Sequence, residues 1–192
     1  MLDQSLATEE NLVTQAKNGD RSAFGELVTR YYPSVIMVIY RMCGDRQMAQ
    51  DAAQEAFIRG WVKLPGFLPH SSFRNWVYRI AVNATLDMLR RRTEVSIESF
   101  AETQMIADQS PSPEAVYIQK EQAELLQQAI RSLPEAARSV LILREYGALS
   151  YEEIAAVLEI PLGTVMSRLN YARNSLKSLM KNYKLKMERD YA

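Results

Sequence analysis

The sequence contains very few of the residues that carry metal-binding and nucleophilic chemistry. Among its 192 residues there is one cysteine, Cys43, and one histidine, His70. One cysteine cannot form a disulfide within the chain, and this pair cannot supply the ligands of a Cys/His zinc site. The lack of disulfides also favours a reducing compartment. We therefore expect no catalytic residue, no metal ion and no cofactor.

A long apolar run and an excess of charge of one sign are also missing. The longest apolar run, Val35–Tyr40, is far too short to cross a bilayer, and the first ten residues are acidic, unlike a secretory signal. We expect a cytoplasmic protein. Lys+Arg and Asp+Glu number 23 each, so the net charge is zero, which taken alone argues against a simple polyanion binder.

The charge is nevertheless unevenly distributed. Residues 163–192 contain seven basic and two acidic residues, whereas residues 96–120 contain one basic and four acidic residues. A near-neutral total with a basic C-terminal region suits a protein that binds DNA weakly alone and specifically only together with a partner protein.

The spacing of apolar residues is helical along most of the chain, without a convincing run of strict alternation, and predicts an all-α protein. Asp20 and Asp45 are expected to cap the second and third helices. We expect helices over about residues 11–18, 21–43, 46–64, 72–92, 116–133, 135–146, 151–158 and from 164 onward, with a kink or interruption at Pro33.

A polar segment divides these helices into two groups. Residues 93–113 are rich in Ser, Thr, Glu, Gln and Asp and end in Ser-Pro-Ser-Pro, a composition typical of a linker. We predict an N-terminal domain over residues 1–95, a flexible linker over 96–118 and a C-terminal domain over 119–185. A linker of about 20 residues spans ~25 Å as a coil and up to ~70 Å when stretched.

The segment from Ser150 to Leu179 predicts a helix-turn-helix. Ser150 and Glu153 form a capping box, a short break contains Pro161, and an amphipathic helix follows. The polar face of that helix can enter a DNA major groove, where Arg pairs with guanine and Ser or Thr reaches bases or phosphates. The alternative is a helical hairpin with a solvated polar face, but the turn and the basic C-terminal helix favour DNA binding. The residues on or beside this face are Thr164, Ser167, Arg168, Tyr171 and Arg173.

The helix expected over residues 72–92 mixes aromatic and cationic side chains. Such a mixture suits single-stranded nucleic acid, because bases stack on aromatic rings and cations follow the phosphates. Phe73 and Trp76 lie on the apolar stripe and can equally belong to the core, whereas Tyr78 and Arg79 are expected on the surface.

The preceding helix carries a compact strip of acidic and amide side chains. Asp51, Gln54, Glu55 and Ile58 are spaced i, i+3, i+4, i+7 and therefore share one face. This face is either solvated or docks on another protein, and the presence of Ile58 favours docking.

Four blocks of sequence carry a resemblance to a known family. They are Asp51-Ala-Ala-Gln-Glu-Ala-Phe-Ile-Arg59; Phe73-Arg-Asn-Trp-Val-Tyr-Arg-Ile-Ala-Val-Asn83; Leu133-Pro134 with Leu143-Arg-Glu-Tyr-Gly147; and Leu149-Ser-Tyr-Glu-Glu-Ile-Ala155 with Pro161-Leu-Gly-Thr-Val-Met-Ser-Arg-Leu169 and Ala172-Arg173. In this order and spacing they resemble the extracytoplasmic-function (ECF) sigma factors, the smallest class of the bacterial sigma-70 family. The resemblance covers about residues 8–183.

The resemblance implies a sigma subunit that binds core RNA polymerase and reads the −10 and −35 promoter elements. It assigns docking on the clamp helices of the largest polymerase subunit to Asp51, Gln54, Glu55, Ile58 and Arg59. It assigns the −10 element, including a flipped base, to Arg74, Tyr78, Arg79, Asn83, Arg90 and Arg91 beside the loop Gly66–Ser72. It assigns the −35 element and its phosphates to Arg144, Ser150, Thr164, Ser167, Arg168, Tyr171 and Arg173. The polymerase flap and an anti-sigma factor are further partners that the resemblance implies.

Two positions depart from the commoner family pattern. Met166 stands where Lys or Arg is frequent, and Tyr171 stands where Arg is frequent, so each removes a cationic contact. Tyr171 can still reach DNA through its hydroxyl group. The −35 sequence that this chain prefers is therefore expected to differ from that of better-known relatives.

Two other functions agree with parts of the sequence. A conventional helix-turn-helix regulator with an N-terminal sensor domain would bind duplex DNA without polymerase, usually as a dimer. A small helical enzyme would need a paired-acid motif, a P-loop or a His/Cys cluster, none of which the sequence contains. We therefore predict a sigma subunit that is not itself an enzyme, because the polymerase supplies the catalytic metals.

Overall fold

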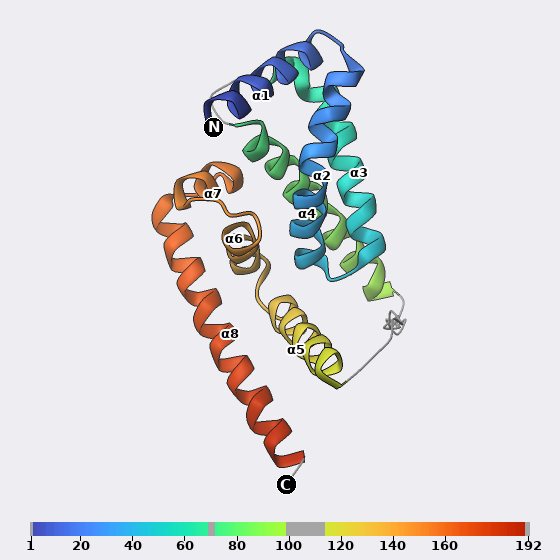
Figure 1. Ribbon diagram of the computed structural model, residues 1–192. Helices are drawn as coiled ribbons and strands as arrows, with labels where there is room; N and C mark the ends of the chain where they lie inside the picture. The colour runs from blue at the N-terminus through green and yellow to red at the C-terminus, as the bar shows by residue number, and fades with distance from the viewer. Residues whose placement is uncertain (1, 69–71, 99–113, 191–192) are drawn as a thin grey trace.

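The computed structural model describes residues 2–68, 72–98 and 114–190 (Figure 1). Within these ranges the chain is helical and contains no strand, which confirms the all-α prediction. The elements are α1 (Leu2–Lys17), α2 (Arg21–Cys43), α3 (Arg46–Lys63), the short 3₁₀ helix η1 (Leu64–Gly66), α4 (Phe73–Glu98), α5 (Glu114–Arg131), α6 (Glu135–Glu145), α7 (Tyr151–Leu158) and α8 (Leu162–Asp190).

The predicted caps of the second and third helices are present. The Asp20 carboxylate accepts hydrogen bonds from the N–H groups of Ser22 and Ala23 at 2.8 and 3.2 Å, and begins α2. The Asp45 carboxylate accepts from the N–H of Met48 at 3.0 Å and begins α3. Each cap satisfies N–H groups that the first turn of a helix leaves without a partner.

The helix is not interrupted at Pro33, because α2 continues through this residue. Proline removes one hydrogen bond from a helix interior. Here Tyr31 and Val35, on either side of it, are 8% and 0% exposed, so packing against neighbouring helices holds the segment helical.

The helices on either side of the predicted linker are longer than expected. α4 continues to Glu98, and α5 begins at Glu114, so both extend into the range 96–118. The rest of the predicted linker, residues 99–113, lies outside the described residues.

Helices α1 to α4 form the N-terminal domain. The buried face of α3 consists largely of small residues, which lets α2 and α4 approach it closely; these are Ala49, Ala52, Ala53, Ala56 and Gly60. At the η1 end, the ring of Trp76 lies 5.1 Å from that of Phe67 and 5.5 Å from that of Phe73. Phe73 is 2% exposed, so this aromatic cluster belongs to the core.

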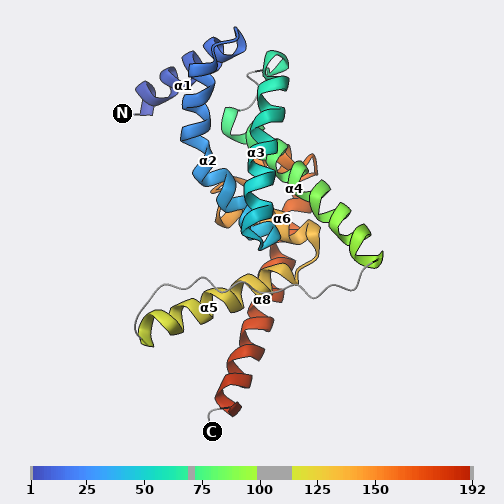
Figure 2. The ribbon, with the colours of Figure 1, turned by 90° about the vertical axis from the view of Figure 1, so that its right-hand side faces the viewer.

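Helices α5 to α8 form the C-terminal domain. The buried stripe of α8 is Val165, Leu169 and Ala172, and it packs against α6 and α7. Figures 1 and 2 both show α8 running past α5 and projecting beyond the other helices.

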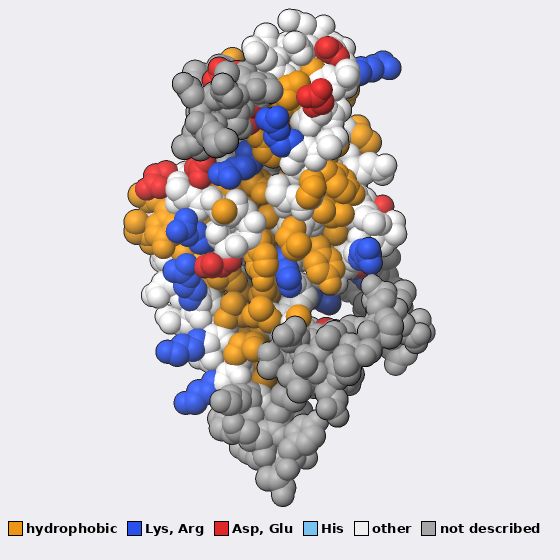
Figure 3. Space-filling view, in the orientation of Figure 1, with side chains coloured by type: hydrophobic (Ala, Val, Ile, Leu, Met, Phe, Trp, Pro, Cys, Tyr) orange, Lys and Arg blue, Asp and Glu red, His pale blue; other side chains and the backbone are white. Residues whose placement is uncertain are grey.

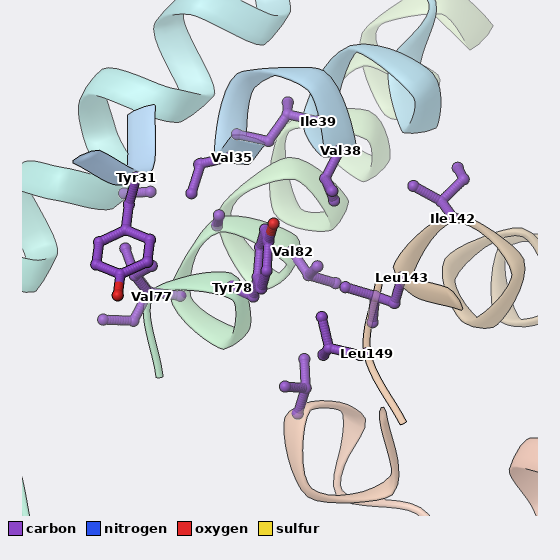
Figure 4. Close-up of a cluster of buried hydrophobic side chains, with 14 of the residues drawn as sticks. Tyr31, Val35, Val38, Ile39, Val77, Tyr78, Val82, Ile142, Leu143 and Leu149 are labelled. Atoms are coloured by element: carbon purple, nitrogen blue, oxygen red, sulfur yellow. The ribbon is translucent and has the colours of Figure 1, made fainter. Parts of the chain in front are cut away.

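The two domains lie against each other along α4. This helix contacts α7, while α2 contacts α5 and α6. Figure 4 shows Tyr78 and Val82 of α4 pointing toward Leu143 and Leu149 of the C-terminal domain. We call this surface the interdomain contact. Its centre is dry, because Tyr78, Val82, Leu143 and Leu149 are at most 1% exposed.

Candidate nucleic-acid interface

The expected docking strip lies on the outer face of α3. Asp51, Gln54 and Ile58 are exposed, and Glu55 and Arg59 are half-buried. The Arg59 Nε donates to Glu55 at 2.7 Å, and its guanidinium also lies 3.7 Å from the Asp87 carboxylate on α4. These carboxylates raise the pKa of Arg59. Arg59 therefore joins α3 to α4 as well as facing outward.

Val62 extends this strip and was missed from the sequence. It lies one turn beyond Ile58, and the two side chains are 72% and 57% exposed. The spacing i, i+4 from Ile58 was the available signal. We call Asp51, Gln54, Glu55, Ile58 and Val62 the α3 docking strip.

Three arginines of the predicted −10 surface form ion pairs across the interdomain contact. Arg74 lies 3.3 Å from Glu153, and Arg90 lies 3.1 Å from Glu135. Arg79 pairs with Glu159. The N-terminal domain thus presents its cations to carboxylates of the helix-turn-helix domain.

Glu153 is the most connected of these carboxylates. Its Oε1 accepts from Asn75 Nδ2 at 2.9 Å as well as from Arg74, and its Oε2 accepts from the N–H of Ser150 at 2.7 Å. Partial burial opposes ionisation, but the Ser150, Asn75 and Arg74 donors outweigh it and hold the pKa of Glu153 below its usual range. One carboxylate therefore completes the capping box of α7 and joins that helix to α4.

The expectation that Tyr78 lies on the surface is wrong, because this side chain is 1% exposed. The apolar stripe of α4 predicts only the side facing its own domain, and the C-terminal domain covers a second side (Figure 4). Arg79 is exposed as expected, and Asn83, Arg90 and Arg91 are exposed as well. Of the loop Gly66–Ser72, residues 69–71, including His70, lie outside the described residues.

A second set of polar contacts joins the C-terminal end of α2 to the other domain. Arg41 Nη1 donates to Gln127 Oε1, and Gln127 Nε2 donates to the Arg41 carbonyl, both at 3.0 Å. Arg138 Nη1 donates to the Met42 carbonyl at 2.9 Å, and burial lowers the pKa of this guanidinium. These contacts lie outside the predicted DNA-binding residues and were not expected from the sequence.

The predicted helix-turn-helix is present in α7 and α8. The Ser150 hydroxyl accepts from the N–H of Glu153 at 3.1 Å, which completes the capping box. The turn passes through Glu159, whose φ of 54° lies in the left-handed region. α8 begins at Leu162, two residues earlier than expected.

The predicted −35 residues do not form a uniform cationic face. Ser167, Tyr171 and Arg173 are exposed, and Thr164 and Arg168 are half-buried. Arg173 pairs with Glu145 at 2.7 Å. Arg144 Nη1 donates to the Leu149 carbonyl at 2.7 Å, and its guanidinium lies 5.2 Å from the ring centre of Tyr151. Arg144 is exposed and stabilises the turn before α7 through these two contacts. Figure 3 shows Lys and Arg side chains along the edge of α8, with hydrophobic surface near the end that meets α7.

Two other kinds of feature are missing from the described ranges. Among those residues, no group of three or more His, Cys, Asp or Glu side chains is placed to hold a metal ion. In the same part of the chain, every helix is too short or too polar for a membrane span.

Comparison with known proteins connects both domains to transcription factors of bacteria. The sigma-70 region 2 profile matches residues 27–95, and the sigma-70 region 4 profile matches residues 123–176. RNA polymerase sigma-H factor of Pseudomonas aeruginosa is 38% identical over 176 residues, which cover 88% of this chain and 91% of that protein. ECF RNA polymerase sigma factor SigW of Bacillus subtilis is 34% identical over 178 residues, which cover 88% of this chain and 95% of that protein.

Solved structures show the same fold. CnrH, determined in complex with the cytosolic domain of CnrY, superposes with a TM-score of 0.70 at 24% identity and covers 91% of this chain and 98% of that chain. RpoE from Bartonella quintana, determined with the anti-sigma factor NepR, superposes with a TM-score of 0.67 at 24% identity and covers 82% of this chain and 96% of that chain. Together, the two profiles and the curated relatives show that the chain belongs to the extracytoplasmic-function sigma factors of the sigma-70 family, which are transcription initiation factors.

Proposed function

We propose that the chain binds core RNA polymerase through the α3 docking strip and directs initiation at promoters whose −10 and −35 elements its two domains recognise. The exposed pair Ile58 and Val62 carries the polymerase contact. Two exposed branched apolar side chains beside carboxylates suit docking on a protein better than solvation. The polymerase supplies the catalytic metals, so we assign no enzymatic activity to the chain and place it in the cytoplasm with its partner.

Run-off transcription with purified core polymerase tests this proposal. Wild-type protein should give promoter-specific products from native templates. Ile58→Ala combined with Val62→Ala should lower the affinity for core polymerase by at least about tenfold, because exposed apolar anchors dominate interface energies. Asp51→Ala combined with Glu55→Ala should also weaken binding, with circular dichroism unchanged in both.

Met37→Ala is the matched control, since Met37 on α2 is 44% exposed and lies outside the α3 docking strip. A lack of promoter-specific product from every native promoter would overturn the sigma function. Specific duplex binding by a dimer without polymerase would instead support a conventional helix-turn-helix regulator.

For the −10 element, the cations Arg74, Arg79 and Arg90, together with Asn83 and Arg91, are the proposed contacts. In the interdomain contact, carboxylates occupy positions beside these arginines where phosphates would bind. Promoter binding therefore requires the carboxylates to leave and the domains to separate. Separation also matches the promoter geometry, because elements about two helical turns apart lie ~70 Å apart.

The interdomain contact contains a feature that favours such separation. The Oδ1 atom of Asn75 is buried there, and no described residue donates a hydrogen bond to it. A buried acceptor without a partner costs about 1–3 kcal/mol. Opening the contact returns this atom, and the hydroxyl of Tyr78, to water or to DNA.

For the −35 element, α8 is the proposed reader, with Ser150, Thr164, Ser167 and Arg168 near the bases and Arg144 and Arg173 near the phosphates. An anti-sigma factor is a further proposed partner. It is supported by the solved complexes of two proteins of this fold with CnrY and NepR.

A further inference from the structure

The surface of α8 that would face DNA carries no charge at its centre. Six exposed residues of its first turns follow helical spacing and are uncharged; they are Gly163, Met166, Ser167, Asn170, Tyr171 and Asn174. The nearest cations, Arg168 and Arg173, lie beside this stripe. Arg168 is half-buried, and Arg173 pairs with Glu145 at 2.7 Å. We call these six residues the neutral stripe of α8.

Met166 is the apolar member of the neutral stripe that lies nearest the start of the helix. Its side chain is 48% exposed, and Leu162, one turn earlier, is 37% exposed. The preceding residue, Val165, faces the core and is 0% exposed, so the core of the helix-turn-helix is complete without Met166. The exposed methionine is therefore not required by packing within its own domain.

The position of Met166 matches the part of a recognition helix that meets base edges. In helix-turn-helix proteins the N-terminal residues of the second helix contact the bases in the major groove. Met166 stands four residues after Leu162, the first residue of α8. It is flanked on the same face by Ser167 and Asn170, which are polar and able to hydrogen-bond.

A thioether has a specific complement in the major groove. Thymine is distinguished there by an apolar group, its C5-methyl, while the other bases present hydrogen-bond donors and acceptors. A flexible, polarizable methionine makes favourable apolar contacts and only weak hydrogen bonds. We propose that Met166 contacts the methyl group of one thymine in the −35 element and is a specificity-determining residue for that position. The inference rests on the proposed function of α8.

Replacing thymine by deoxyuridine removes this methyl group and leaves base pairing and the phosphates unchanged. The loss of one buried methyl-sized group corresponds to about a fourfold change in an equilibrium constant. We therefore expect about a fourfold loss of promoter occupancy at one thymine, and little loss at the others.

The experiment uses holoenzyme reconstituted from the full chain and core polymerase. A template pool randomised over the −35 and −10 elements is first selected for run-off transcription. Each thymine of the selected −35 element is then replaced singly by deoxyuridine, and promoter occupancy is measured for wild-type, Met166→Ala and Met37→Ala holoenzymes.

Deoxyuridine at one −35 position should lower the promoter occupancy of wild type and Met37→Ala about fourfold. The occupancy of Met166→Ala should not change with deoxyuridine at that position. Met166→Lys should also be insensitive and should steepen the salt dependence by about one unit of slope, as expected for one added phosphate contact. Wild-type activity unchanged by every deoxyuridine, or an equal loss in Met166→Ala, would overturn the inference while leaving the sigma function intact. If the unsubstituted pool gave no specific transcript, the proposed function and this inference would both fall.

Discussion

The two surfaces proposed to meet DNA are protected from non-specific contacts in different ways. On α4, three arginines pair with carboxylates of the other domain, and Tyr78 is buried beside them. On α8, the neutral stripe is open but lacks charge. Non-specific DNA affinity comes mainly from cations that neutralise phosphates. One surface therefore lowers it by pairing its arginines with carboxylates, and the other by placing no cation at its centre.

The largest expected effect tests whether α4 is covered in the free protein. Tyr78→Ala should lower the free energy of unfolding by about 3 kcal/mol, because it removes a large buried side chain. Tyr171→Ala is the matched control on α8; its side chain is 53% exposed, and the loss should be below about 0.5 kcal/mol. Urea denaturation measures both. A loss below about 1 kcal/mol for Tyr78→Ala would mean that the domains are apart in solution.

The next effect concerns the carboxylate that joins α7 to α4. Glu153→Gln weakens the bonds from Arg74 and Asn75 and should cost the interdomain contact about 1 kcal/mol. Affinity for a single-stranded oligonucleotide should rise up to about fivefold, as measured by fluorescence anisotropy at low salt.

Glu152→Gln is the control for Glu153→Gln. It removes the same charge from the same helix, but Glu152 is exposed, and no ion pair involving it is found among the described side chains. If both variants raised the affinity equally, the change would reflect net charge alone and would contradict the covering role of Glu153.

A smaller effect is expected when the pH is lowered. The donors around Glu153 hold its pKa below the unfolded value of about 4.3. A lowered pKa gives stability that is present above the unfolded value and is lost as the pH falls through the folded value. Wild-type stability should therefore fall below about pH 4, and Glu153→Gln should fall less steeply over the same range.

Asp45 should contribute a loss of stability at low pH that wild type and Glu153→Gln share. The N–H of Met48, and then Arg92, hold its pKa below the usual range. Identical pH profiles of stability for wild type and Glu153→Gln, measured by urea denaturation, would contradict the contribution of Glu153 to stability.

The smallest effect is expected from glycine substitutions at two residues in the left-handed region, Ala148 with φ 52° and Glu159 with φ 54°. Glycine adopts this conformation without steric cost. Ala148→Gly should therefore raise the free energy of unfolding by about 0.5 kcal/mol. Glu159→Gly should raise it less, because the ion pair with Arg79 is lost. Equal gains in thermal denaturation would indicate that this pair does not form in solution.

Local sequence signals predicted the capped helix starts and the helix-turn-helix well, but not the start of α1, which begins at Leu2 instead of near residue 11. Asp20, Asp45 and Ser150 cap helices as expected, because a cap depends on residues within one turn. The same local reasoning allowed an interruption at Pro33 that α2 does not contain, because packing of the residues around it outweighs the loss of one hydrogen bond. It also omitted Val62, although the spacing from Ile58 was visible.

By itself, the sequence determined the all-α class, the family and the residues that bear charge on each helix, because these depend on periodicity, capping and motif spacing. Only the tertiary structure decided what each charged residue meets. Arg74 pairs with Glu153 across 79 positions and Arg79 with Glu159 across 80, and Tyr78 is buried by a domain far away in the chain. Such contacts follow from how two folded domains pack, and no local pattern in the sequence encodes that packing.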